Sequence, residues 1–285
     1  MGKGTKIGTL FVVSTPLGNL KDITLRAVDI LRVVHVIAAE DTRGTRRLLS
    51  AYGIRGHLVS YREQNRERAA IKILDVLRDG RDAALVTDAG TPGISDPGGH
   101  LISLCISEEI EVIPIPGPSS IICALSVSGI DSSQFVFLGF LPRKGKKREA
   151  VLAELGNETR TAVIFESPKR VQKTLPEILN YAGDRMSALC RELTKVHEEI
   201  MRGRVSEILE KISHRTDIRG EVVIVIAGKD TKEGTKIDSD TLRREAQRLM
   251  SENPGKRPKE VARLLSARLG VSIKTAYDEV IRKRK

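Results

Sequence analysis

Tryptophan is absent from this chain of 285 residues, and aromatic residues make up only 3% of it. A platform of aromatic rings that stacks single-stranded bases is therefore not evident in the sequence. Cysteine is also scarce, since the three copies lie far apart and form no C-x-x-C pair. This spacing predicts neither a disulfide framework nor a structural zinc site. We expect all three cysteines to be small, buried, apolar residues.

Long hydrophobic runs are lacking as well. Because no stretch of about 18 apolar residues occurs, the sequence predicts no transmembrane helix. The opening MGKGTKIGTL has no apolar segment typical of a signal peptide, so we expect a cytoplasmic location. The chain is instead rich in positive charge, with 48 Lys and Arg against 37 Asp and Glu. The net charge of +11 favours a polyanionic partner, nucleic acid first.

The first 130 residues alternate short apolar segments with amphipathic ones. Apolar runs predict strands at 9–14, 34–39, 57–61, 83–87 and 111–115. Helical spacing predicts helices at 24–31, 42–52, 66–78, 98–107 and 119–127. Such alternation is typical of an α/β domain with a mostly parallel sheet that helices cover on both faces. In these sheets, ligands bind beyond the carboxyl ends of the strands.

Residues 131–230 are expected to form a second α/β domain. Its strands are predicted at 135–140, 161–165, 188–192 and 222–227, and its helices at 150–155 and 171–181. The tail, 231–285, contains 15 Lys and Arg against 8 Asp and Glu and is predicted to hold helices at 241–250, 259–269 and 273–282. With Gly270 and Ser272 as caps, the last two helices resemble a helix-turn-helix. Nucleic-acid contact, packing and dimer support are all open for this tail.

The loops that follow the predicted strands are unusually rich in Gly, Pro, Ser and Thr. STPLGN, after the first strand, fits a plain turn or a ligand loop, but it is neither a G-x-G-x-x-G nor a Walker sequence. In VTDAGTPGISDPG, Asp88 and Asp96 suit either a metal site or, more simply, a turn and a helix cap. In PIPGPSS, capping accounts for one of the two serines and leaves the other free to bind. In EDTRGTRR, Asp41 or Thr42 caps a helix, and the arginines are left to bind an anion.

Seven segments, which occur in a fixed order along the chain, together resemble those of one known protein family. They are STPLGNLKDIT, AAEDTR, DAGTPGISDPG, PIPGPSS, FLGFLPRKGKKR, IFESPKR and CRELTKVHEE. With these segments, residues 8–228 resemble the ribosomal RNA small subunit methyltransferase I subfamily of the tetrapyrrole methylases. The resemblance implies the two-domain α/β fold of class III methyltransferases, here followed by a small basic helical tail. It further implies a homodimer and S-adenosylmethionine bound between the domains.

The same resemblance implies a substrate and a set of cofactor contacts. The subfamily methylates the ribose 2′-hydroxyl of a cytidine in the decoding region of 16S rRNA, so the expected partner is rRNA within the assembled 30S subunit. The cofactor contacts carried over to this sequence are Pro16, Leu17, Gly18, Gly90, Thr91, Ile94, Ser119, Ser120, Glu166 and Ala227. At Thr91 the sequence departs from tetrapyrrole-modifying relatives, which usually carry Gly-Asp-Pro where this chain has Gly-Thr-Pro. No metal is expected, because the methyl donor is already activated.

Removal of the ribose proton calls for a nearby acceptor. We expect Lys195 in this role, with Glu192 or Glu40 as alternatives. If residues 191–196 form a strand, Arg191, Leu193 and Lys195 lie on one face and Glu192 on the other. His197 is expected at the surface.

RNA contact is expected first at the basic cluster that follows Leu141-Pro142. Its members are Arg143, Lys144, Lys146, Lys147 and Arg148, and Arg43 and Arg62 are expected to add to it. Two other functions remain open from the sequence. One is methylation of a tetrapyrrole or another small molecule, against which the widely spread positive charge argues. The other is a nucleic-acid-binding regulator without catalysis, which uses the tail alone.

Overall fold

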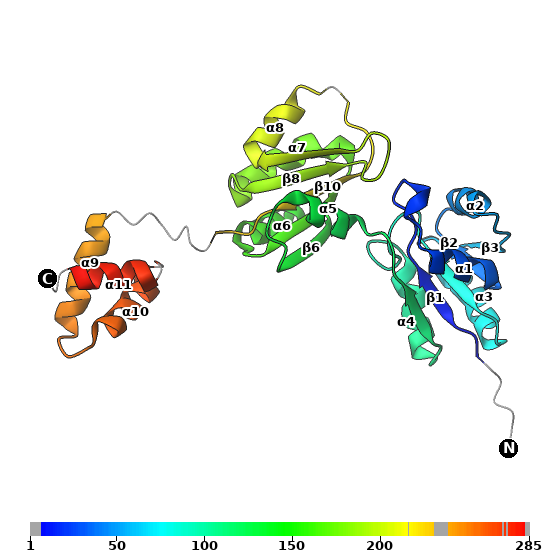
Figure 1. Cartoon of the computed structure of the whole chain (residues 1–285), viewed down its shortest axis with the longest axis horizontal. Coiled ribbons are helices and arrows are strands. Elements are labelled where there is room, and N and C mark those ends of the chain that lie inside the picture. The colour runs from blue at the N-terminus through cyan, green and yellow to red at the C-terminus, as the bar shows by residue number, and fades with distance from the viewer. Residues whose placement is uncertain (1–6, 216, 231–238, 270, 272, 283–285) are drawn as a thin grey trace, which may run out of the picture. The chain divides into compact units, whose positions relative to one another are not determined.

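The computed structural model describes residues 7–215, 217–230, 239–269, 271 and 273–282 (Figure 1). The chain divides into two compact units, Met1–Ala227 and Gly228–Lys285. The first unit contains two five-stranded sheets. Among the described residues, no helix combines the length and the apolar character that a membrane span requires.

The first sheet is parallel throughout, with strand order β3-β2-β4-β1-β5. Its strands are β1 (Leu10–Val13), β2 (Val36–Ala39), β3 (Leu58–Ser60), β4 (Ala83–Val86) and β5 (Val112–Ile115). The helices are α1 (Leu25–Val33), α2 (Thr42–Ala51), α3 (Arg66–Arg78), α4 (Gly98–Ser107) and α5 (Ser120–Ser128). A short 3-10 turn, η1 (Leu20–Asp22), precedes α1. The predicted alternation of strands and helices is therefore confirmed.

Both faces of this sheet are buried because successive side chains of a strand point to opposite sides. In β2, Val36 and Ala38 pack with α3 and α4, whereas Ile37 and Ala39 pack with α1 and α2. The continuous apolar strands of the sequence follow from this double cover.

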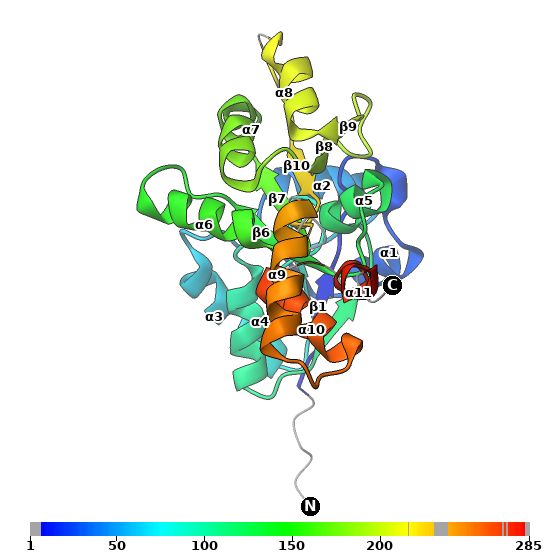
Figure 2. The same ribbon diagram turned by 90° about the vertical axis from the view of Figure 1, so that its left-hand side faces the viewer.

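The second sheet is mixed, with strand order β6-β7-β10-β8-β9, and only β6 and β7 pair in parallel. Its strands are β6 (Phe135–Phe140), β7 (Thr161–Glu166), β8 (Met186–Arg191), β9 (Glu199–Arg204) and β10 (Val222–Ile226). The helices α6 (Lys146–Asn157), α7 (Pro168–Ala182) and α8 (Val205–Ser213) share a core with one face of it. The opposite face packs against α5, as Figure 2 shows.

β9 and α8 were not predicted from the sequence. β9 reads EIMRGR and buries only Met201, so it shows no apolar run and its alternation is weak. Two of the three cysteines, Cys105 and Cys190, are buried as expected, and Cys123 is half-buried. Burial raises the pKa of both buried thiols to about 11.

The second unit has a core of its own. It consists of α9 (Ser239–Glu252), α10 (Pro258–Leu269) and α11 (Ile273–Arg282), which confirms the three predicted helices. Leu249, Leu265 and Val280 lie in a cluster to which all three helices contribute. The predicted caps Gly270 and Ser272 lie outside the described residues.

Candidate functional site

The loops at the carboxyl edge of the first sheet are tied to one another. Thr15 and Gly90 exchange two backbone hydrogen bonds of 2.9 and 3.0 Å, and the Thr15 hydroxyl donates to Thr87 O at 3.0 Å. Gly90 has φ +85, a left-handed conformation that favours glycine. The loops after β1 and β4 therefore form one rigid support at this edge.

The Thr91 hydroxyl extends this support to the loop after β5. It lies 3.1 Å from Ser14 Oγ and donates to Pro118 O at 3.2 Å. Gly117 approaches Ser14 so closely that a Cβ atom on it would lie 2.9 Å from Ser14 Cβ. The hydroxyl that departs from the tetrapyrrole-modifying pattern thus links three loops. Ser119, at the N-cap of α5, makes no side-chain capping bond.

A cavity of about 400 Å³ lies between these loops and the second sheet, within the first unit. The first half contributes Leu17, Thr87 and Ala89 to its wall, and the second contributes Phe165, Cys190 and Val223. Of the predicted site residues, it is lined by Leu17, Ile94, Ser120, Glu166 and Glu40. Those that do not line it are Pro16, Gly18, Gly90, Thr91, Ser119, Ala227, Lys195 and Glu192. We call this cavity the main pocket.

Ala227 lies at the wrong end of its strand for the predicted contact. β10 runs antiparallel to β7 and β8, so its first residue, Val222, pairs with Glu166 and its last, Ile226, pairs with Ala162. The pocket meets the start of β10, at 220–223. The resemblance alone implied this contact, and the position of Ala227 at the far end of β10 does not support it.

The main pocket is acidic. The carboxylate residues that line it are Glu40, Asp88, Asp96, Glu166 and Glu221, and among the described residues of its lining there is no lysine, arginine or histidine. Asp96 serves the loop itself, since its Oδ1 accepts from the backbone N–H groups of Gly93 and Gly98. Asp96 therefore stabilises the turn as predicted, but the residue at the N-cap of α4 is Pro97 and not Asp96. The excess of carboxylates favours a ligand with positive charge.

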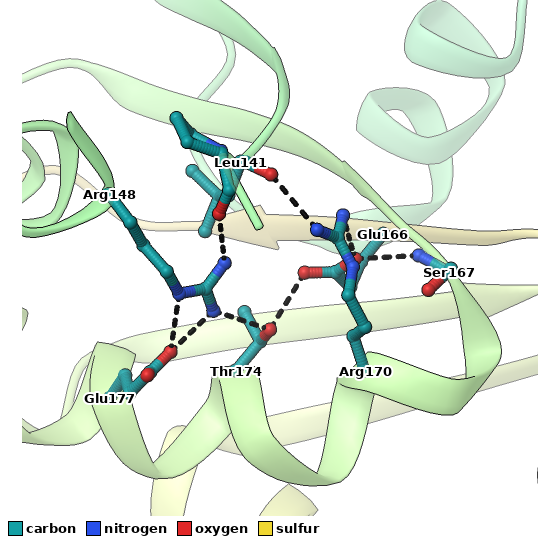
Figure 3. A network of polar contacts seen from close by, with 8 residues as sticks. Leu141, Arg148, Glu166, Ser167, Arg170, Thr174 and Glu177 are labelled. Atoms are coloured by element: carbon teal, nitrogen blue, oxygen red, sulfur yellow. Dashed lines mark hydrogen bonds and ion pairs between the residues drawn. The ribbon is translucent and has the colours of Figure 1, made fainter. Parts of the chain in front are cut away.

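Glu166 is neutralised inside the protein, as Figure 3 shows. Its side chain is fully buried, forms a 2.5 Å ion pair with Arg170 and accepts from the Thr174 hydroxyl at 2.7 Å. The backbone N–H of Ser167 donates to the same carboxylate at 2.7 Å. Glu166 thus lines the pocket, but its carboxylate already has partners within the protein.

Arg148 belongs to the same network and is corrected as a predicted RNA contact. Its side chain is 5% exposed, pairs with Glu177 and donates to Thr174 Oγ1 and Pro142 O at 2.8 and 2.9 Å (Figure 3). On α6 it shares the buried stripe of Leu152 and Leu155, at helical spacing. The predicted helix began at residue 150, which left Arg148 in an exposed loop. Its neighbours Arg143, Lys144, Lys146 and Lys147 are exposed.

The segment after β8 is a turn and not the strand we expected. The backbone φ angles of Glu192 and Thr194 are +54 and +66, so the chain reverses there into β9. Alternation of faces therefore fails, and the Lys195 ammonium lies 2.8 Å from Glu192 Oε1. His197, in the same turn, is exposed as expected.

Lys195 is a poor proton acceptor in this setting. Burial alone would lower its pKa, but the carboxylates of Glu192 and Glu221 outweigh burial and raise it. In Glu192, burial opposes the Lys195 ammonium and the Glu221 N–H, which together lower the carboxyl pKa. The raised pKa does not favour the expected role of Lys195 as base, and that role stays a prediction.

Lys195 instead holds the two halves of the first unit together. A Cβ atom on Gly18 would lie 2.1 Å from Lys195 Cγ, so the lysine stem occupies the space that a side chain would fill. Beside it, the Asn19 N–H donates to Thr194 Oγ1 at 3.2 Å. Leu17 and Leu193 belong to one buried cluster at the same junction. The loop after β1 is thus clamped to the β8–β9 turn.

Two smaller hollows open beside the main pocket. The first, of about 350 Å³, is lined by Arg43 and Arg62 and is called the Arg43 hollow. The second, of about 190 Å³, is lined by Arg47, Pro16 and Gly18 and is called the Arg47 hollow. Asp41 caps α2 by accepting from the Arg43 N–H, as one alternative predicted, and the Arg43 side chain is 84% exposed. The Arg47 hollow can therefore offer a guanidinium group to an anion, whereas carboxylates outnumber the two arginines in the lining of the Arg43 hollow.

Several residues of the pocket were not predicted from the sequence. Phe140 and Phe165 form an edge-to-face pair with ring centroids 5.5 Å apart, and both line the cavity. The motif FLGFLPRKGKKR contains Phe140, but its basic residues predict only contact with phosphate. Gly220 has φ +88 and lies against Glu192, where a Cβ atom would meet the carboxyl group at 2.3 Å. No motif indicated this last contact.

Comparison with known proteins gives consistent results. The family model of the tetrapyrrole (corrin/porphyrin) methylases matches residues 9–209. The chain is 46% identical over 224 residues to the ribosomal RNA small subunit methyltransferase I of Thermotoga maritima, which covers 79% of this chain and all of that protein. It is 41% identical over 275 residues to the protein of the same name from Neisseria meningitidis, which covers 95% and 92% of the two chains.

Solved structures share the fold at low sequence identity. Cobalt precorrin-4 methyltransferase, a cobalamin biosynthetic enzyme, aligns with a TM-score of 0.59 at 18% identity, over 77% of this chain and 94% of that chain. Uroporphyrin-III C-methyltransferase of Thermus thermophilus, complexed with S-adenosylhomocysteine, aligns with a TM-score of 0.56 at 18% identity, over 77% and 97%. With its two sheets and with relatives above 40% identity over most of its length, the chain belongs to the ribosomal RNA small subunit methyltransferase I family of the tetrapyrrole methylases.

Proposed function

We propose that the chain transfers a methyl group from S-adenosylmethionine to the ribose 2′-hydroxyl of a cytidine in small-subunit rRNA. Membership of the family supports methyl transfer and an rRNA substrate. The observation that carries the proposal for this molecule is an acidic pocket next to exposed basic residues. The proposal includes two further expectations from the resemblance, a homodimer and the assembled 30S subunit as substrate.

The main pocket fits the cofactor in size and charge. Its volume of about 400 Å³ lies within the usual range for small-ligand sites, roughly 300–1,000 Å³. The cofactor carries a sulfonium and an ammonium group, and among the described lining residues Glu40, Asp88 and Asp96 offer carboxylates that form no ion pair. Leu17, Ile94 and Phe140 supply apolar surface for its uncharged parts, and Ser120 supplies a hydroxyl.

The chain's own contribution to the reaction is mainly positioning. The cofactor supplies a methyl group that is activated by its positive sulfur. The loops linked through Thr15, Gly90 and Thr91 form a rigid base, so the reacting groups can be held in line with little loss of entropy. The clamp between Gly18 and Lys195 holds the second half against this base.

The basic loop at 143–147 is in reach of an RNA bound at the pocket. Phe140 lines the pocket, and Arg143 follows it by three residues, a span of at most about 11 Å along the chain. The Arg148 and Arg170 guanidinium groups hold the carbonyls of Pro142 and Leu141 at 2.9 and 3.1 Å, which fixes the start of the loop. Lysine and arginine placed in this way would neutralise phosphates.

The test is methylation in vitro with cofactor labelled in the methyl group. Assembled 30S subunits, naked 16S rRNA and a tetrapyrrole precursor are offered separately. We expect label in the 30S subunits, in a cytidine whose 3′ linkage resists alkali because its 2′-oxygen is blocked. Label on a base, or on the macrocycle alone, contradicts the proposal.

A matched pair of variants ties the activity to the pocket. Ser120 lines the cavity at the first turn of α5, whereas Ser126 is exposed on the same helix. Ser120→Phe is expected to abolish cofactor binding in equilibrium dialysis, and Ser126→Phe to leave it within about twofold of wild type. Equal binding by both variants would place the cofactor elsewhere.

A further inference from the structure

Asp88 lies where the main pocket and both arginine hollows meet. Among the described residues it is the only one that lines all three cavities. It is exposed and lies two residues beyond Val86, the last residue of β4. A substrate that enters from either hollow therefore reaches the pocket past this carboxylate.

The orientation of the Asp88 carboxylate is fixed by one of its oxygens. Oδ1 accepts the backbone N–H of Asp41 at 2.8 Å, which links the loops after β4 and β2. The described residues give Oδ2 no hydrogen-bond partner, so this oxygen remains able to accept a proton. From the sequence, Asp88 is expected to be a turn residue. Its hydrogen bond to the Asp41 N–H fits that role but engages only Oδ1.

The other carboxylates of the pocket also have protein partners. Glu166 is buried and ion-paired with Arg170, and Asp96 caps its own loop. Glu221 lies 3.3 Å from the Lys195 ammonium. Glu40, like Asp88, has one side-chain oxygen engaged, since its Oε2 accepts the Thr87 hydroxyl at 2.9 Å. It lines the main pocket and the Arg43 hollow but not the Arg47 hollow, which is what distinguishes it from Asp88.

Each hollow holds arginine that can bind a phosphate of a nucleotide. Arg47 lines one hollow, and Arg43 and Arg62 line the other beside the carboxylates of Glu40, Asp41 and Glu63. Guanidinium groups bind phosphate through paired N–H donors. A nucleotide whose flanking phosphates occupy the two hollows has its ribose between them, at Asp88.

On the basis of the proposed function, we propose that Asp88 is the catalytic residue that accepts the proton of the ribose 2′-hydroxyl. A lone pair of the ribose oxygen forms the bond to the methyl carbon, and the carbon–sulfur bond breaks with its electron pair left on sulfur. The hydroxyl proton passes to Asp88 Oδ2. The resulting carboxylic acid then releases the proton to water.

The test compares Asp88→Asn with wild type in single-turnover methylation of 30S subunits. Asparagine keeps an oxygen that can accept the Asp41 N–H but cannot take the proton. General-base catalysis contributes typically 10²–10⁴-fold. We therefore expect the rate to fall by about that factor, and the Kd of S-adenosylhomocysteine to stay within about twofold. The residual rate of the variant should continue to rise with pH, because hydroxide replaces the missing base.

Asp29→Asn is the matched control, since it makes the same chemical change on the exposed surface of α1. It should leave the rate unchanged. A fall of less than tenfold in Asp88→Asn, or a large fall in Glu40→Gln with little in Asp88→Asn, overturns the assignment. If wild type methylates no rRNA substrate, the proposed function fails instead, so the two failures are distinguishable.

Discussion

Replacement of Arg148 by alanine separates the two roles that a basic residue at this position can have. The side chain is 5% exposed and its guanidinium is shared among Glu177, Thr174 and Pro142. Removal of one partner of a buried ion pair costs about 3–5 kcal/mol, because the other charge is left without compensation. Glu177 is 28% exposed and can be partly rehydrated, which places the cost near the lower limit.

The expected loss of about 3 kcal/mol in the free energy of unfolding is large enough to measure by thermal denaturation. For a unit of this size, 1 kcal/mol lowers Tm by roughly 2–4 °C, so Arg148→Ala should lower the melting temperature of the first unit by about 6–12 °C. Differential scanning calorimetry of the full chain is the assay, with the transition of the three-helix unit as an internal reference.

Lys147→Ala is the matched control, one residue away and exposed. Its Tm should change little, since exposed substitutions usually stay within about 0.5 kcal/mol. Its RNA affinity should depend less on salt, by roughly 0.7–0.9 in the slope of log K against log salt for one lost phosphate contact. A wild-type Tm together with a reduced salt slope in Arg148→Ala would refute the structural role and restore the expectation from sequence.

Two further substitutions test the clamp and the pH dependence of stability. Gly18→Ala puts a methyl group against the Lys195 stem and should lower the free energy of unfolding by about 1–3 kcal/mol through overpacking. Gly44→Ala is the control and should not lower it, because its Cβ atom would meet only Asp41 Oδ2, at 3.9 Å. Equal urea midpoints for the two variants would disprove the clamp. For Glu199, the Arg215 and Arg191 guanidinium groups lower the pKa to about 2, from an ordinary value of 4.5. Because the folded state holds this carboxylate ionised, its stabilisation is complete above about pH 4.5 and is lost as the pH falls toward 2. Glu199→Gln should therefore flatten the fall of the urea midpoint between pH 5.5 and 2.5, and parallel curves for variant and wild type would exclude this ion pair as a cause.

The sequence predicted the first sheet well, because parallel strands buried on both faces are short apolar runs with clear boundaries. It predicted the second sheet less well, because β9 is half-exposed and because the composition of a strand does not show whether it runs parallel or antiparallel to its neighbours. Because β10 runs antiparallel to its neighbours, Ala227 lies at the end of the strand away from the main pocket, which the sequence could not indicate. The roles of Arg148 and Lys195 depend on which side chain faces inward, which follows from where α6 begins and where β8 ends. An error of a few residues at either boundary therefore changes whether the side chain of Arg148 or Lys195 is expected to be buried or available to a substrate.

The hydrogen bonds of the Thr91 hydroxyl to Ser14 and Pro118 limit which side chains position 91 can accept. Its hydroxyl donates to Pro118 O, which an aspartate carboxylate has no proton to do. The aspartate of the tetrapyrrole-modifying pattern, introduced here alone, would place a negative charge against a carbonyl oxygen. We expect such a graft to fail unless the loop after β5 is exchanged with it. Position 91 and that loop are therefore epistatic, and natural variants should change them as a pair.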